Sequence, residues 1–120
     1  MIDDQLYVYE VKDVLRVIDG DSYEIVIDLG FNALLRIRAR LLGADTFEMR
    51  GGTETTKQLA RDGQKFAEMW LSDGPIFCRT HSVDSFGRWL AEFWNGEGEH
   101  LAARLIEAGF TTGRYEEEER

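Results

Sequence analysis

Three short polar clusters in this chain contain the residue types that together could hydrolyse a phosphodiester. The clusters are Asp19-Gly20-Asp21-Ser22, the segment from Arg40 to Asp45-Thr46-Phe47-Glu48, and Asp84-Ser85-Phe86-Gly87-Arg88. Their carboxylates suit a hard divalent cation, and a guanidinium group can hold phosphate through two parallel hydrogen bonds. A further carboxylate can accept the proton of an attacking water molecule. Each cluster alone is also typical of a polar turn, so its meaning depends on the elements around it.

Hydrophobic alternation predicts five strands around these clusters. The expected strands are residues 6–17, 23–29, 33–42, 76–81 and 89–94. The first is interrupted by polar residues, which predicts a bulge. Asp19-Gly20 predicts a tight hairpin, because glycine adopts positive φ without steric cost.

Residues 33–42 alternate most clearly of the five strands. One expected face contains Leu35, Ile37, Ala39 and Leu41, and the other contains Arg36, Arg38 and Arg40. We interpret Arg36 and Arg38 as solvent-exposed charges, and Arg40 as the arginine that belongs to the site.

Two helices complete the predicted order βββαββα. The first follows Gly51-Gly52 with Thr53 or Thr55 as N-cap, and Gly63 should weaken it slightly. The second carries Leu101, Leu105 and Ile106 and ends at Gly109, a C-cap. This order predicts a β-rich α+β fold, a five-stranded OB-fold barrel, whose open face commonly binds oligonucleotides or oligosaccharides.

Length and composition predict one domain with a polar C-terminal extension. The chain has 120 residues, 43% of them hydrophobic, and we expect a domain over residues 1–115 and a disordered acidic tail over 116–120. No run approaches the roughly 20 apolar residues that cross a bilayer, and Met1-Ile2-Asp3-Asp4 does not resemble a secretory signal. With the single cysteine, Cys78, these features predict a cytoplasmic monomer that does not enter membranes.

The net charge of −9 argues against a simple cationic nucleic-acid binder. The charge is unevenly distributed, because residues 116–119 are all glutamate whereas residues 31–40 hold three arginines and no acid. A locally basic strand can still bind phosphate, although with modest affinity.

Other chemistry-bearing residues lack a pattern that assigns them to a site. His81 and His100 have no ligand-like spacing and are expected to be non-catalytic. Trp70, Trp89 and Trp94 are expected to be core aromatics. No zinc motif, P-loop or Ser-His-Asp pattern is recognisable.

At these motifs the chain resembles the staphylococcal nuclease (thermonuclease) family, over about residues 11–115. The matching segments are Val17-Ile18-Asp19-Gly20-Asp21-Ser22, Arg40-Leu41-Leu42-Gly43-Ala44-Asp45-Thr46-Phe47-Glu48, Asp84-Ser85-Phe86-Gly87-Arg88 and Leu105-Ile106-Glu107-Ala108-Gly109-Phe110. The family fold is an OB barrel with helices, which agrees with the order predicted above.

The resemblance implies a role for each site residue. Asp21, Asp45 and the main-chain carbonyl of Thr46 would hold a calcium ion, with Asp19 as a supporting acid behind them. The resemblance gives Glu48 the role of general base, and it gives Arg40 and Arg88 the role of phosphate ligands. Tyr115 would line the nucleotide pocket. The implied reaction is calcium-dependent endo- and exonucleolytic cleavage of DNA and RNA, preferably single-stranded, with 3′-phosphorylated products.

Four positions depart from the family pattern. Phe47 replaces a proline, Ser85 and Phe86 replace a lysine and a tyrosine that help to bind a terminal phosphate, and Ala102 replaces an asparagine. Together with the acidic composition, these departures motivate an alternative, a weak or inactive module that binds nucleic acid or a protein partner. A third reading is an inhibitor or assembly protein that uses its acidic tail as a contact.

Overall fold

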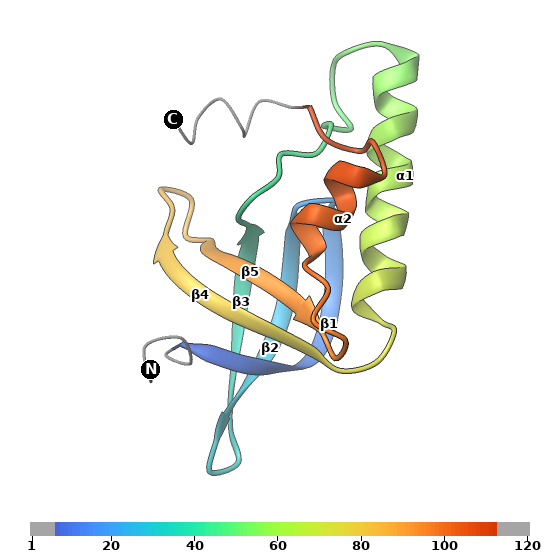
Figure 1. The fold of residues 1–120 in the computed structure, drawn as a ribbon. Coiled ribbons are helices and arrows are strands. Elements are labelled where there is room, and N and C mark those ends of the chain that lie inside the picture. The colour runs from blue at the N-terminus through green and yellow to red at the C-terminus, as the bar shows by residue number, and fades with distance from the viewer. Residues whose placement is uncertain (1–6, 113–120) are drawn as a thin grey trace.

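Five strands form a closed barrel in the computed structural model, which describes residues 7–112. The elements in chain order are β1 (Val8–Asp19), β2 (Ser22–Gly30), β3 (Ala33–Leu41), α1 (Glu54–Leu71), β4 (Ile76–Val83), β5 (Trp89–Asn95) and α2 (Leu101–Glu107). The strands follow the barrel wall in the order β1-β2-β3-β5-β4, and both helices lie on one side of it (Figure 1). The predicted order and the β-rich α+β OB-type barrel are confirmed.

The antiparallel β4–β5 hairpin closes the barrel by pairing with the β1–β2–β3 meander at both of its edges. β4 pairs antiparallel with β1, and β5 pairs parallel with the end of β3. Three register shifts along β1 confirm the predicted bulge, the first of them between Val11 and Asp13. Bulges bend and twist a strand, which allows β1 to contribute to both edges of the closing sheet.

The core fills the barrel and continues under the helices. Tyr23 of β2 and Phe93 of β5 are fully buried and meet edge to face, with ring centroids 5.5 Å apart. Leu101 and Leu105 of α2 are also fully buried. Cys78 is buried as predicted, and this burial raises the pKa of its thiol to about 12, so it acts as a small apolar residue.

Leu35, on the apolar face predicted for residues 33–42, and Trp89, predicted to be a core aromatic, are both exposed. Leu35 is 48% exposed and Trp89 is 39% exposed. The β2–β3 hairpin extends beyond the barrel (Figure 1), so the inward face of its outer half has no opposing layer. Trp89 is the first residue of β5, where the sheet ends. The predicted alternation was therefore correct, but alternation alone does not show how far along β3 the barrel covers the apolar face.

The strand ends differ slightly from the prediction. β1 begins at Val8 and continues to Asp19, and β4 extends to Val83, two residues beyond His81. These extra residues pair across hairpins, where propensity is a weak guide and hydrogen bonding decides the boundary.

The sequence explains where α1 begins, but it does not explain how α1 packs. Thr53 is the N-cap and exchanges hydrogen bonds with Thr56 in a capping box, which confirms one of the two predicted caps. Gly63 is buried, and a Cβ there would lie 3.2 Å from Cβ of Phe110. Gly63 therefore permits close packing of the C-terminal segment, a benefit that the predicted loss of helix propensity ignores.

α2 is a short helix with a capping residue at each end. His100 is its N-cap, and Ala108 is its C-cap, one residue before the predicted Gly109. Gly109 has φ of +85° and follows the cap, which is the usual place of a left-handed glycine. Ile106 is 36% exposed rather than part of the core.

Some predictions lie outside the described part of the chain. Tyr115, the acidic segment 116–120 and Leu6 belong to this group. Within residues 7–112, neither helix is long and apolar enough to cross a lipid bilayer.

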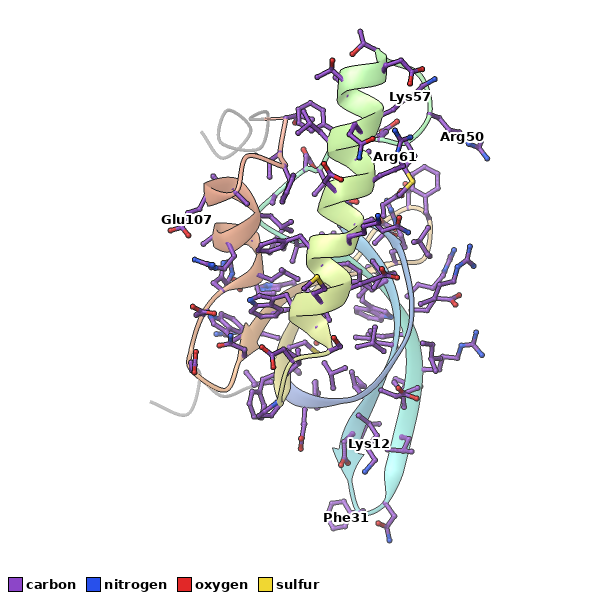
Figure 2. All side chains as sticks on the ribbon, turned by 90° about the vertical axis from the view of Figure 1, so that its right-hand side faces the viewer. Lys12, Phe31, Arg50, Lys57, Arg61 and Glu107 are labelled. Atoms are coloured by element: carbon purple, nitrogen blue, oxygen red, sulfur yellow. The ribbon has the colours of Figure 1, made fainter. Side chains whose placement is uncertain are left out.

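The tip of the β2–β3 hairpin provides a test of backbone strain. Phe31 has φ of +58° and is fully exposed at the far end of the molecule (Figure 2). We expect Phe31→Gly to raise the free energy of unfolding by about 0.5–1 kcal/mol, because only glycine adopts this conformation without steric cost. Urea unfolding measures the change through the transition midpoint.

Gly30 supplies the matched control for this test. It has φ of +85° and open space around its Cα, so Gly30→Ala changes backbone strain alone and should destabilise by about 1 kcal/mol. Destabilisation by Phe31→Gly would show that the Phe31 side chain makes a contact that outweighs the strain.

Candidate active site

One cavity of about 860 Å³ collects residues from all three polar clusters. It lies at the end of the barrel where β1 turns into β2 and β3 ends. The sequence-predicted site residues that line it are Asp19, Asp21, Arg40, Asp45, Thr46, Glu48 and Arg88. The structure therefore brings together every predicted site residue that it describes. Arg36 and Arg38 do not line the cavity.

Strand pairing explains why distant segments meet here. Ser22 of β2 pairs with Arg40 of β3, and the main-chain N of Leu41 donates to the carbonyl of Asp21 at 2.9 Å. The parallel pairing of β3 with β5 sets Ala39 opposite Trp89, so Arg88 comes level with Arg38 in the second half of β3. The site is thus a consequence of barrel closure.

The guanidinium of Arg40 lies between two carboxylates. Its Nη1 is 3.4 Å from Oδ2 of Asp21, and its Nη2 is hydrogen bonded to Oδ1 of Asp45. Nη1 also donates to the main-chain carbonyls of Leu41 at 2.8 Å and Ala44 at 3.2 Å. All three charged side chains are mostly buried, so these interactions are less screened by water than surface ion pairs are.

The segment after β3 is fixed against the first hairpin. The main-chain N of Thr46 donates to Oδ2 of Asp21 at 3.0 Å, and the N of Thr112 donates to the carbonyl of Asp45 at 2.9 Å. A Cβ on Gly20 would lie 2.8 Å from Cγ2 of Thr46. Gly20 does not have positive φ. The reason predicted for this glycine was therefore wrong, because close approach to Thr46, not backbone conformation, requires it.

Thr46 also carries an unsatisfied polar atom. Its hydroxyl Oγ1 is buried and, within residues 7–112, has no hydrogen-bond partner. A buried hydroxyl without a partner costs about 1–3 kcal/mol, so such atoms commonly mark a place where a ligand or water is bound.

Asp84 positions Arg88 through a tight turn. Oδ1 of Asp84 accepts hydrogen bonds from the main-chain N atoms of Phe86 and Arg88, both at 2.9 Å. Oδ2 accepts from Nε of Arg88 at 2.9 Å. The main-chain donor of Arg88 is the largest cause that lowers the pKa of Asp84. In the described part of the chain, the terminal nitrogens of Arg88 have no hydrogen-bond partner, which leaves them available to an anion.

Sequence reasoning did not find two residues that hydrogen bond to main-chain carbonyls next to the site, Tyr23 and Gln64. The buried hydroxyl of Tyr23 donates to the carbonyl of Gly20, and burial raises the pKa of Tyr23 well above 10, so it keeps this proton. Gln64 of α1 donates from Nε2 to the carbonyl of Val17 at 2.9 Å. No local motif marks either residue, because their partners are main-chain carbonyls, one of them distant in sequence and the other within a turn.

Arg38 has a role that the sequence did not indicate. Its Nη2 donates to the carbonyl of Phe86 at 2.5 Å, so it fixes the turn that carries Arg88. Arg38 is therefore a support of the site, not only an exposed charge. The two histidines lie away from the cavity, where Nε2 of His81 and of His100 contact different oxygens of Glu92.

The negative charges of the cavity act on one another. Burial is the largest cause that raises the pKa of Asp19, and the charges of Asp21 and Glu48 raise it further. Arg88 and Arg40 oppose this shift in part. The carboxylates are thus close enough to repel, which favours binding of a cation or proton.

The donor chemistry of the cavity fits a hard cation. Asp21 and Asp45 converge on one positive charge, that of Arg40, and the unpartnered Oγ1 of Thr46 lies in the same segment. Oxygen ligands of this type suit calcium. In the described range, no group of three or more His, Cys, Asp or Glu side chains is arranged to hold a metal ion. The calcium ligands therefore stay a prediction.

Comparison with protein-family models found no match, and comparison with curated proteins found none either. The functional argument for this chain consequently depends on the chemistry of the cavity.

The pKa of Asp19 predicts a pH-dependent effect on stability. Ionised Asp19 is disfavoured in the fold, so we expect Asp19→Asn to raise the free energy of unfolding at neutral pH. The destabilisation is full above the raised pKa and is lost as the pH falls through it towards 3.8, where unfolded Asp19 also protonates. Urea unfolding at a series of pH values should show a gain that disappears in acid.

Asp13 provides the control for this measurement, because it is exposed on the same strand and does not line the cavity. An equal gain in the free energy of unfolding from Asp13→Asn would contradict the attribution of the effect to the raised pKa of Asp19. It would indicate instead that any loss of negative charge stabilises the fold.

Proposed function

We propose that this chain is a calcium-dependent nuclease that hydrolyses phosphodiester bonds of DNA and RNA, preferably single-stranded, and leaves 3′-phosphorylated products. The carrying observation is the convergence of Asp21, Asp45, Glu48, Arg40 and Arg88 on one cavity from three separated segments. The resemblance to the staphylococcal nuclease family supports the same reaction.

The two arginines would bind the scissile phosphate. Asp84 contacts the guanidinium of Arg88 through Nε alone, so the terminal nitrogens of Arg88 suit two phosphate oxygens. Arg40 lines the same cavity, with its charge already among carboxylates. As negative charge grows on the phosphate oxygens in the transition state, fixed guanidinium groups stabilise it without reorganisation.

Glu48 is the acid best suited to activate water. Its side chain is exposed and lines the cavity, so water can reach it. In the reaction, Glu48 accepts a proton from water, the water oxygen bonds to phosphorus, and the bond from phosphorus to the 5′ oxygen breaks. The departing 5′ oxygen takes up a proton from solvent water, Glu48 later releases its proton to solvent, and the phosphate stays on the 3′ side.

Asp21, Asp45 and Thr46 would hold the calcium ion. The ion would supply Lewis-acid polarisation of the phosphate. Asp19 lines the same cavity and would add negative charge near these ligands, since the charge of Asp21 contributes to the raised pKa of Asp19.

A binding module is the second candidate, and one observation favours it. The guanidinium of Arg40 is engaged by Asp21, Asp45 and two carbonyls, so fewer of its donors face a phosphate than those of Arg88. Phe86 is 71% exposed beside Arg88 and could stack on a base. Such a module would bind single strands without cutting them.

Cleavage of a fluorogenic single-stranded oligonucleotide, with calcium or with chelator, tests the nuclease. We expect calcium-dependent cleavage, and we expect Glu48→Gln to lower kcat by about 10²–10⁴-fold because the base is lost. Arg88→Gln should lower kcat by about 10²–10³-fold. His81→Gln, which lies away from the cavity, is the control. Binding without calcium-dependent cleavage would select the binding module instead.

Asp84 should act through Arg88. We expect Asp84→Asn to lower kcat by about tenfold, because the amide keeps one turn acceptor but loses the charged contact to Nε of Arg88. In the double variant with Arg88→Gln, Asp84→Asn should lower kcat no further than Arg88→Gln does alone. Additive losses would mean that Asp84 contributes independently of Arg88.

A further inference from the structure

Three basic side chains lie at the end of the molecule that holds the beginning of α1, and one of them lines the candidate cavity. Arg50 lines the cavity and is exposed, in the loop between β3 and α1. Lys57 and Arg61 belong to the first turns of α1 and, being four residues apart, share one face of the helix. Figure 2 shows all three at one end of the molecule, with Lys12 at the opposite end. We name Arg50, Lys57 and Arg61 the basic path.

Few acids neutralise the basic path. Nζ of Lys57 is 3.9 Å from Oε2 of Glu54, an exposed pair that contributes little. Arg61 donates from Nη2 to the neutral side chain of Gln58, which in turn donates to Asp62. The path therefore carries positive charge on a chain whose net charge is −9. Grouped cations with little local compensation repel each other, so an anion that contacts several of them is favoured.

The position of the path indicates which anion. Arg50 lines the cavity together with Arg40 and Arg88, and it lies at the same end of the molecule as Lys57 and Arg61 (Figure 2), so the cavity and the basic path share this residue. A molecule with one phosphate in the cavity and further phosphates along its chain would contact both. A mononucleotide would reach only the cavity.

We propose that the basic path binds the phosphates of a polynucleotide next to the scissile one, so that the enzyme prefers long strands to dinucleotides. This inference rests on the proposed function, because it uses the cavity as the site of cleavage. The path contributes affinity without base recognition, since its groups contact the backbone. Continuity with the cavity fixes the strand so that a phosphodiester lies between Arg40 and Arg88.

The salt dependence of binding tests the path separately from cleavage. The probe is a fluorescent single strand of about 20 nucleotides, titrated in chelator at several salt concentrations. Each phosphate contact on a single strand adds about 0.7 to the slope of log K against log salt. We expect Lys57→Gln/Arg61→Gln to reduce that slope by about 1.4, and Arg50→Gln to reduce it by about 0.7.

A second double variant controls for net charge. Lys12 lies at the far end of the molecule, and Arg104 is bonded to Glu107 on another side (Figure 2). Lys12→Gln/Arg104→Gln removes the same two positive charges, and we expect it to leave the slope unchanged. Equal reductions from the two double variants would overturn the path, because they would report general repulsion. An unchanged slope in Lys57→Gln/Arg61→Gln would also overturn it.

Cleavage rates separate failure of the path from failure of the proposed function. We expect Lys57→Gln/Arg61→Gln to lower the ratio of kcat/KM for the long strand to kcat/KM for a dinucleotide by at least about tenfold. Cleavage with an unchanged ratio would keep the nuclease and reject the path. The expected salt slopes without any cleavage would keep the path and reject the nuclease. Loss of polyglutamate binding with an unchanged oligonucleotide slope would assign the surface to an acidic protein and overturn the proposal.

Discussion

The guanidinium of Arg40 holds the carboxylates of Asp21 and Asp45 around one positive charge at the end of the barrel. Without it, two mostly buried carboxylates would face each other in surroundings that screen charge poorly, and one of them would have to move or take up a proton. The carbonyls of Leu41 and Ala44 orient the guanidinium. This interaction joins the first hairpin to the segment after β3, and residues of both segments line the cavity, so the shape of the cavity depends on it.

The same cavity opposes the stability of the fold in two ways. Asp19 has a raised pKa because it is partly buried near other acids, and the hydroxyl of Thr46 is buried without a partner among the described residues. Both features are unfavourable in the folded chain and both are relieved by a bound cation or a donor. Tyr23 and Gln64 offset them by satisfying main-chain carbonyls beneath the hairpin. A rigid support around a strained centre is typical of sites where chemistry takes place.

Local patterns predicted much of this molecule. Alternation in residues 33–42, the Thr53 cap and the glycine-containing turns depend on interactions within a few residues, so they are readable in order along the chain. The exposure of Leu35 and Trp89 was missed, because alternation tells which face a side chain occupies and not whether a second layer covers it. Tyr23, Gln64 and Arg38 were missed as supports, because each contacts a main-chain carbonyl, and every residue type presents that group.

The sequence by itself determined the order of strands and helices along the chain, the Thr53 cap of α1 and the chemical inventory of acids and arginines, because these depend on residue type and spacing. Only the tertiary structure decided that Arg40 is shared by two carboxylates, that Asp84 orients Arg88, and that Gly20 is needed for its closeness to Thr46. Only it, too, connected Arg50 with the cavity. Barrel closure is the physical reason, because it brings chain segments from 19 to 88 together through backbone pairing, and the resulting side-chain distances are set by the whole sheet.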